Sequence, residues 1–234
     1  MSASSLPVPV AATLAGFSYL AYAPAEADAD QALPAVVIMH YLTGRPETLA
    51  PLFQALAVPA RFICPQGRYP AGEGYSWFVE DFYDQDLPAQ AILIRQTAAD
   101  LAAFLNALPQ HLRLADRPVV TGFSQGGDLS YALALGHPEC VGMAIPMGGR
   151  LEPPFRPAQV TEAARRVPMR VLHGEGDPIV PIERVRDGVA WLSAQGCDVQ
   201  LTTYPNGKHD APPEMQKDLR ALTTAYLQRA AARA

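Results

Sequence analysis

The feature that most constrains this chain is the sequence Thr-Gly-Phe-Ser-Gln-Gly-Gly at residues 121–127, which places Ser124 in a Gly-x-Ser-x-Gly pattern. An apolar run, residues 118–121, leads into it, and a helix-compatible stretch, residues 128–135, follows. This context is typical of a sharp strand–turn–helix junction that presents a serine hydroxyl above a sheet. The glycines allow close approach of strand and helix, and the helix N-terminus favours nearby negative charge. The alternative is a glycine-rich turn with an idle serine, so chemistry depends on finding partners for Ser124.

The composition favours one globular domain with no nucleic-acid partner. The 234 residues are 49% hydrophobic and 18% charged, which suffices for one well-buried core. The net charge of −5 gives no broad basic face, so we expect no binding to nucleic acid. The cysteines at positions 64, 140 and 197 show no CxxC pair or metal-ligand spacing, so reduced thiols and no metal site are expected.

The N-terminal residues and the apolar runs bear on location. Residues 1–15 carry no basic residue, and Pro7 and Pro9 interrupt their apolar run, unlike a secretory signal. We expect these residues to form an irregular leader at the start of a single domain spanning residues 1–234. No run approaches the roughly 18 apolar residues of a membrane span. The sequence therefore predicts a cytoplasmic protein without a membrane span.

Apolar runs and amphipathic stretches alternate along the chain. Strands are predicted at residues 17–23, 35–39, 61–64, 118–121, 141–147, 169–172 and 199–203. Helices are predicted at residues 46–57, 87–108, 128–135, 182–192 and 215–226. Residues 65–75 are rich in glycine and proline, and we expect them to be irregular. The alternation indicates an α/β fold, a mostly parallel central sheet with helices on both faces and no large lid domain.

Ser124 needs a general base, because a free serine hydroxyl is a poor nucleophile. Of the five histidines, His209 lies in a glycine-containing loop after the last strand and before the last helix. In a parallel sheet this loop opens at the C-terminal edge of the strands, beside Ser124. The other four, which follow buried strands or helix ends, are His40, His111, His137 and His173. We predict His209 as the base, with a surface histidine as the alternative.

The base needs a carboxylate that fixes its tautomer, and Asp177 is the best candidate. Asp177 follows a strand at the same sheet edge, where Pro178 and Pro181 would stiffen the loop. Glu175 is the main rival; residues 198 and 210 fit less well because one begins a strand and the other adjoins His209. The resulting order, Ser then Asp then His, is that of the α/β-hydrolase fold.

An acyl-transfer reaction also needs two backbone N–H donors for the developing oxyanion. The first is the N–H of Gln125, which follows the nucleophile. The second should come from the loop after the strand at residues 35–39, and Leu42 is the predicted donor.

Three motifs together resemble the phospholipase/carboxylesterase family of α/β-hydrolases, which includes acyl-protein thioesterases and small bacterial carboxylesterases. They are Gly-Phe-Ser-Gln-Gly-Gly at 122–127, His-Gly at 173–174 with Asp-Pro-Ile-Val-Pro at 177–181, and Gly-Lys-His at 207–209. The resemblance extends from about residue 35 onward. It implies the same triad and oxyanion donors, hydrolysis of carboxylic esters or thioesters, no cofactor, and a homodimer as a possible assembly.

The chain departs from the family's pattern beside the second oxyanion donor. Where the family usually has His-Gly, this chain has His40-Tyr41, and a tyrosine does not readily adopt positive φ. We therefore expect a different loop geometry, with the phenol lining the cleft. The resemblance also places Trp77 and Phe78 near the acyl pocket, although a cluster of aromatic residues in a loop more often forms a satellite core than a ligand-binding wall. Residues 128 and 175 carry charge where the family more often has small or neutral residues.

The sequence thus predicts a serine hydrolase that forms and then hydrolyses an acyl-enzyme on Ser124. An acyltransferase with the same triad, and a catalytically silent hydrolase fold that binds a ligand or partner, are the alternatives.

Overall fold

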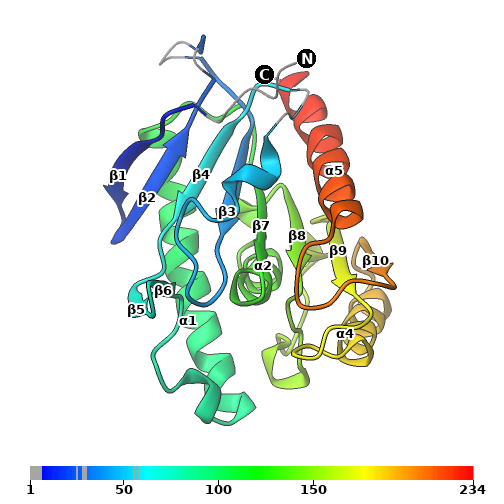
Figure 1. The fold of residues 1–234 in the computed structure, drawn as a ribbon. Coiled ribbons are helices and arrows are strands. Elements are labelled where there is room, and N and C mark those ends of the chain that lie inside the picture. The colour runs from blue at the N-terminus through cyan, green and yellow to red at the C-terminus, as the bar shows by residue number, and fades with distance from the viewer. Residues whose placement is uncertain (1–6, 25, 28–30, 55, 57, 234) are drawn as a thin grey trace.

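The computed structural model describes residues 7–24, 26–27, 31–54, 56 and 58–233, and within them one eight-stranded sheet crosses the molecule (Figure 1). Its order is β1-β2-β4-β3-β7-β8-β9-β10. The strands are β1 (Val10–Leu14), β2 (Phe17–Tyr22), β3 (Ala35–Met39), β4 (Arg61–Pro65), β7 (Val119–Phe123), β8 (Met143–Met147), β9 (Met169–Gly174) and β10 (Val199–Tyr204). β2 pairs antiparallel with β1 and β4, and the other neighbours are parallel.

Helices cover both faces of this sheet. They are α1 (Leu87–Ala107), α2 (Gln125–Gly136), α3 (Glu162–Arg165), α4 (Ile182–Ala194) and α5 (Pro213–Ala231), with short 3-10 helices η1 (Ala50–Phe53), η2 (Phe82–Asp84), η3 (Leu108–Gln110), η4 (Pro138–Cys140) and η5 (Pro153–Phe155). The alternation of side chains along β3 shows the two layers. Val37 and Met39 pack in the core with α1, α2 and α4, whereas Val36 and Ile38 pack with η1 and α5. The predicted α/β-hydrolase architecture is confirmed.

The longest helix, α1, follows from its start signals and its apolar stripe. Asp86 caps it by accepting a hydrogen bond from the Ala89 N–H at 2.8 Å, and Pro88 occupies the first turn. Together with η3, residues Leu87–Gln110 are long and apolar enough to span a membrane by length and composition alone. However, 44% of the most apolar window is buried inside the protein, and buried Leu101 and Leu105 pack into the core. The core helix of a soluble protein passes the same test.

The expectation of an irregular leader at residues 1–15 is wrong for residues 10–14, which form the edge strand β1. Ala15 and Gly16 connect β1 to β2, and both have positive φ, 47° and 80°. A two-residue turn of this kind matches the twist of a hairpin. Alanine rarely adopts positive φ, so the sequence carried no clear turn signal. Residues 1–6 lie outside the described residues.

Two further expectations need correction on the way to the site. The helix predicted at residues 46–57 is a series of turns with η1, because Pro51 has no N–H for the carbonyl of Glu47 and interrupts a regular helix; residues 55 and 57 lie outside the described residues. The stretch at residues 65–75 is not wholly irregular: Tyr69–Ala71 (β5) and Gly74–Ser76 (β6) form a small hairpin.

Candidate active site

Ser124 lies at a sharp turn between β7 and α2. Its backbone has φ 55° and ψ −112°, an unfavourable conformation for a residue with a side chain. The strand and helix that flank it are in close contact. A Cβ added to Gly122 would lie 2.7 Å from the Gly126 Cα, and one added to Gly126 would lie 2.2 Å from the carbonyl oxygen of Met39 at the end of β3. Glycine at both positions is therefore required, as the sequence indicates.

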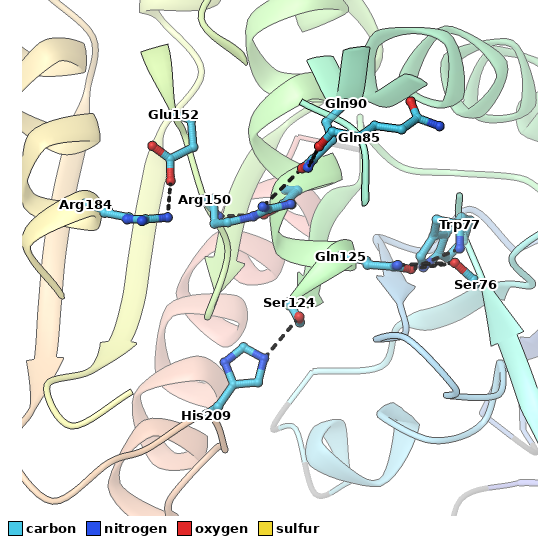
Figure 2. A network of polar contacts seen from close by, with 11 residues as sticks. Ser76, Trp77, Gln85, Gln90, Ser124, Gln125, Arg150, Glu152, Arg184 and His209 are labelled. Atoms are coloured by element: carbon cyan, nitrogen blue, oxygen red, sulfur yellow. Dashed lines mark hydrogen bonds and ion pairs between the residues drawn. The ribbon is translucent and has the colours of Figure 1, made fainter. Parts of the chain in front are cut away.

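The side chains of Asp177, His209 and Ser124 form a continuous chain of contacts. Nδ1 of His209 lies 2.7 Å from Oδ2 of Asp177, and its Nε2 lies 3.1 Å from Oγ of Ser124. Figure 2 shows the imidazole directed at the serine hydroxyl. These groups come from the loops after β9, after β10 and after β7, so parallel strands bring them to one sheet edge.

The contacts of Asp177 determine which nitrogen of His209 carries the proton. Oδ1 of Asp177 accepts hydrogen bonds from the backbone N–H groups of Ile179 and Val180, at 2.8 and 2.9 Å. Oδ2 of the ionised carboxylate can only accept, so Nδ1 of His209 donates to it. Nε2 then presents a lone pair to the Ser124 hydroxyl. This is the tautomer that a general base requires.

The carboxylates considered as alternatives to Asp177 contact residues other than His209. Glu175 accepts a hydrogen bond from Thr203 Oγ1 at 2.7 Å and lies 3.6 Å from the Arg186 guanidinium. Asp198 pairs with Arg170, and the exposed Asp210 accepts a hydrogen bond from the Lys208 N–H at 3.0 Å. Among the described residues, Asp177 is the carboxylate in contact with His209.

His40 and His173 are buried structural residues, as the strand ends indicate. Burial lowers the pKa of His40 to about 4. The neutral ring donates from Nδ1 to the Tyr41 carbonyl at 2.8 Å and accepts at Nε2 from the Gly67 N–H at 2.9 Å. Burial likewise lowers the pKa of His173, whose Nε2 lies 2.8 Å from the Val180 carbonyl oxygen. His173 thereby supports the loop that carries Asp177.

Ser124 and His209 lie in the wall of a cavity of about 730 Å³. The lining residues are Tyr41, Leu42, Leu49, Tyr83, Phe123, Ser124, Ile179, His209, Asp210 and Ala211. Most of these side chains are apolar or aromatic, and Asp210 is the acidic side chain of the set. Leu42, Tyr83 and Ile179 are exposed by 37%, 47% and 64% and form an apolar rim. The cavity is therefore suited to an uncharged, apolar group next to the serine hydroxyl.

The two predicted oxyanion donors belong to two segments near Ser124, the start of α2 and the loop after β3. Gln125 is the first residue of α2, and its N–H has no partner within the helix because the first turn lacks preceding carbonyls. Leu42 lines the cavity in the loop after β3. Tyr41 also lines the cavity, as expected, with its ring edge-on to Phe123 at 6.2 Å. The positive φ expected to be a difficulty at Tyr41 falls instead on Thr43, at 67°.

Trp77 and Phe78 do not line the cavity, which corrects their expected role in substrate binding. Each is 1% exposed. Phe78 stacks on Phe82 with ring centroids 4.1 Å apart, so the aromatic segment is largely a part of the core. Tyr83, five residues after Phe78, lines the cavity but was not predicted as a site residue. The sequence also gave no signal for Ile179, whose exposure depends on the turn after Asp177.

A buried ion pair lies one helical turn after Ser124. The Arg150 guanidinium contacts the Asp128 carboxylate at 2.8 Å, and their side chains are 13% and 3% exposed. Burial raises the pKa of Asp128, and the adjacent Arg150 opposes that effect. Arg150 also lies 3.3 Å from Gln90, a contact drawn in Figure 2, and its guanidinium lies over the ring of Tyr83. The charge at residue 128 therefore faces a partner inside the protein and not solvent.

Across the described part of the chain, no group of three or more His, Cys, Asp or Glu side chains could hold a metal ion.

Comparison with known proteins identifies the relatives of this chain. A family model described as Phospholipase/Carboxylesterase matches residues 21–226. An acyl-protein thioesterase 1 of Gibberella zeae is 36% identical over 115 residues, which cover 48% of this chain and 49% of the relative. A probable inactive carboxylesterase of Oryza sativa subsp. japonica is 29% identical over 147 residues, covering 57% and 56%. The chain thus spans about half the length of these curated relatives.

Solved structures extend the similarity over almost the whole fold. A carboxylesterase from Mesorhizobium loti superposes with a TM-score of 0.74 at 22% identity, over 92% of this chain and 98% of the other. At this identity the match supports the shared fold.

Proposed function

The chain belongs to the phospholipase/carboxylesterase family, and we propose that it is a serine hydrolase that cleaves carboxylic ester or thioester bonds through an acyl-enzyme. The observation that carries the proposal is the chain of contacts from Asp177 through His209 to Ser124 in the wall of an apolar cavity. Ser124 would be the nucleophile, His209 the general base and Asp177 the residue that orients it.

In the first step, Nε2 of His209 takes the Ser124 proton as Oγ attacks the acyl carbon. The carbonyl electron pair moves onto oxygen, and the N–H groups of Leu42 and Gln125 would stabilise that negative charge. The intermediate then collapses, the bond to the leaving oxygen or sulfur breaks, and His209 returns the proton to the leaving group. Ser124 is left as an ester of the substrate's acyl group.

In the second step, His209 takes a proton from water, and the resulting hydroxide attacks the acyl-enzyme. Collapse of the second intermediate releases the carboxylic acid, and the proton on Nε2 returns to Ser124 Oγ. Asp177 stays ionised throughout and stabilises the imidazolium form of His209.

The cavity supports an apolar acyl substrate. Its aliphatic and aromatic wall can desolvate a hydrocarbon chain, at about 0.8 kcal/mol for each buried methylene. Asp210 at the cavity places a negative charge beside His209, which disfavours binding of a negatively charged substrate. We therefore propose uncharged esters or thioesters as the substrates.

We further propose a cytoplasmic location and no cofactor, with a homodimer as a possible assembly. The three cysteines are unpaired, which suits a reducing compartment. The mechanism above uses side chains and backbone of this chain throughout.

Two other functions share these residues. An acyltransferase would pass the acyl group to an alcohol in place of water, and a silent binding protein would use the cavity without chemistry. The relative named as probably inactive is a reason to test for the second. Covalent labelling by a fluorophosphonate probe would distinguish an active serine from a silent one, and product partition with added alcohol would reveal acyl transfer.

The decisive experiment is the variant Ser124→Ala with p-nitrophenyl butyrate as substrate. We expect turnover to fall by several orders of magnitude, about 10⁶-fold by analogy with other serine hydrolases, while the circular dichroism spectrum is unchanged. Turnover equal to that of the unmodified protein would exclude the proposal.

A further inference from the structure

The segment Tyr75–Ser76–Trp77 contacts the two parts of the chain that carry the predicted oxyanion donors, although none of its residues lines the cavity. On one side it holds the loop at residues 40–44. The Thr43 N–H donates to the Tyr75 carbonyl at 2.9 Å, and the Tyr75 N–H donates to the Gly44 carbonyl at 2.9 Å. Both contacts lie directly after Leu42.

Trp77 fixes the same loop on the other side of Leu42. Its indole Nε1–H donates to the His40 carbonyl at 2.7 Å, and its ring stacks on the His40 imidazole with centroids 4.8 Å apart. His40 is in turn held by the Gly67 N–H. Leu42 therefore lies between anchors at positions 40 and 43, and both anchors belong to one short segment.

The same segment also binds the side chain of Gln125, the residue that follows Ser124. Oε1 of Gln125 accepts a hydrogen bond from the Trp77 backbone N–H at 3.0 Å, and Ser76 Oγ lies 3.2 Å from its Nε2. Figure 2 shows the Gln125 side chain directed at Ser76 and Trp77, away from Ser124 and His209. Gln125 is 1% exposed, so its amide has no solvent to replace these partners.

We propose that Trp77 is a positioning residue that sets the separation between the backbone N–H groups of Leu42 and Gln125. Its indole nitrogen holds the loop before Leu42, and its backbone N–H holds the side chain of Gln125. The inference rests on the proposed function, because the separation of the two donors matters only if they bind an oxyanion. It also explains why an aromatic residue expected at the acyl pocket lies buried beside it.

Loss of the Trp77 contacts should weaken binding of the transition state and have little effect on binding of the substrate in its ground state. Donors must lie within about 3 Å of the oxyanion position, and the loss of one costs roughly 10²–10³-fold in kcat. A donor that is displaced but still present should lower kcat by less than the complete loss of that donor. The acyl group contacts the cavity wall and not Trp77, so KM should change little.

The variant Trp77→Phe tests this, because it removes the indole donor and keeps a buried aromatic ring. The chain has two tryptophans, so Trp191→Phe is a matched control at a site outside the cavity, where Trp191 packs against Arg156. We would measure kcat and KM on p-nitrophenyl butyrate, normalised to the fraction of protein that fluorophosphonate labels at completion. Thermal unfolding of both variants would be recorded in parallel.

We expect Trp77→Phe to lower kcat by about 10-fold or more with KM within about twofold, and Trp191→Phe to leave both within about twofold. Equal kcat in the two variants would overturn the inference. Gln125→Met is the second variant if Trp77→Phe does not fold, with the same expected split. Ser124→Ala separates the two hypotheses: if it is inactive while Trp77→Phe is not impaired, the hydrolase proposal stands and the positioning role falls.

Discussion

The burial of His40 should make the protein sensitive to acid, and the magnitude follows from its pKa. In the folded protein that pKa is about 4, because the ring is buried and 1% exposed. In the unfolded chain it returns to about 6.5. Between these values the unfolded state binds a proton that the folded state does not, so stability falls as the pH falls from 6.5 towards 4.

The size of the effect is large for a single side chain. A difference of two to three pKa units corresponds to about 3 kcal/mol at full development, and about 2 kcal/mol of it is lost between pH 7 and pH 5. His173, whose pKa is also lowered by burial, acts in the same direction. The contribution of His40 must therefore be isolated by comparison with a variant.

The assay is urea unfolding of the unmodified protein and of His40→Gln at pH 7 and pH 5, followed by tryptophan fluorescence. Glutamine can accept the Gly67 N–H and does not titrate, so the variant should lose about 2 kcal/mol less on acidification than the unmodified protein. His111→Gln, at an exposed position, is the control and should behave as the unmodified protein. Equal losses in His40→Gln and the unmodified protein would refute the reasoning, as would an imidazole NMR titration of His40 near pH 6.5.

Four further substitutions test other parts of the structure. Asp177→Asn should lower kcat on p-nitrophenyl butyrate by about 10⁴-fold without unfolding, since the amide can donate to Nδ1 of the imidazole and impose the wrong tautomer; a loss under about tenfold would contradict that. Gly126→Ala should lower the free energy of unfolding by about 3 kcal/mol or more, whereas Gly136→Ala, where a Cβ meets nothing within 4 Å, should raise it by about 0.5–1 kcal/mol; denaturant unfolding measures both, and equal shifts would contradict the packing argument. Tyr41→Ala should shift the preference in a series of p-nitrophenyl esters towards longer acyl chains, and an unchanged profile would remove the phenol from the pocket wall.

Much of the fold was predictable because the apolar runs mark the strands directly. Each run ends where a parallel strand ends, so the residues that follow it share one edge of the sheet. For this reason Ser124, Asp177 and His209 could be grouped from the sequence, and they lie in hydrogen-bond contact. Their catalytic roles remain a prediction that the variants above test.

The remaining features depend on contacts that local sequence does not encode. Trp77 is buried because its indole reaches the carbonyl of His40, 37 positions earlier in the chain, and no periodicity reports such a pairing. The Asp128–Arg150 pair joins side chains 22 positions apart and could not be seen from either charge alone. The edge strand β1 was not predicted for a local reason: the first position of its hairpin turn is an alanine, where glycine or asparagine is the usual signal.

The backbone conformation of Ser124 has a consequence for how sequences of this kind can change. At φ 55° and ψ −112° a residue with a side chain carries a conformational cost of about 1–3 kcal/mol, which glycine would avoid. In a related sequence that no longer needed the proposed activity, glycine at this position would raise the free energy of unfolding. Mutation of Ser124 to glycine would thus favour a more stable fold that lacks the hydroxyl on which the proposed activity depends.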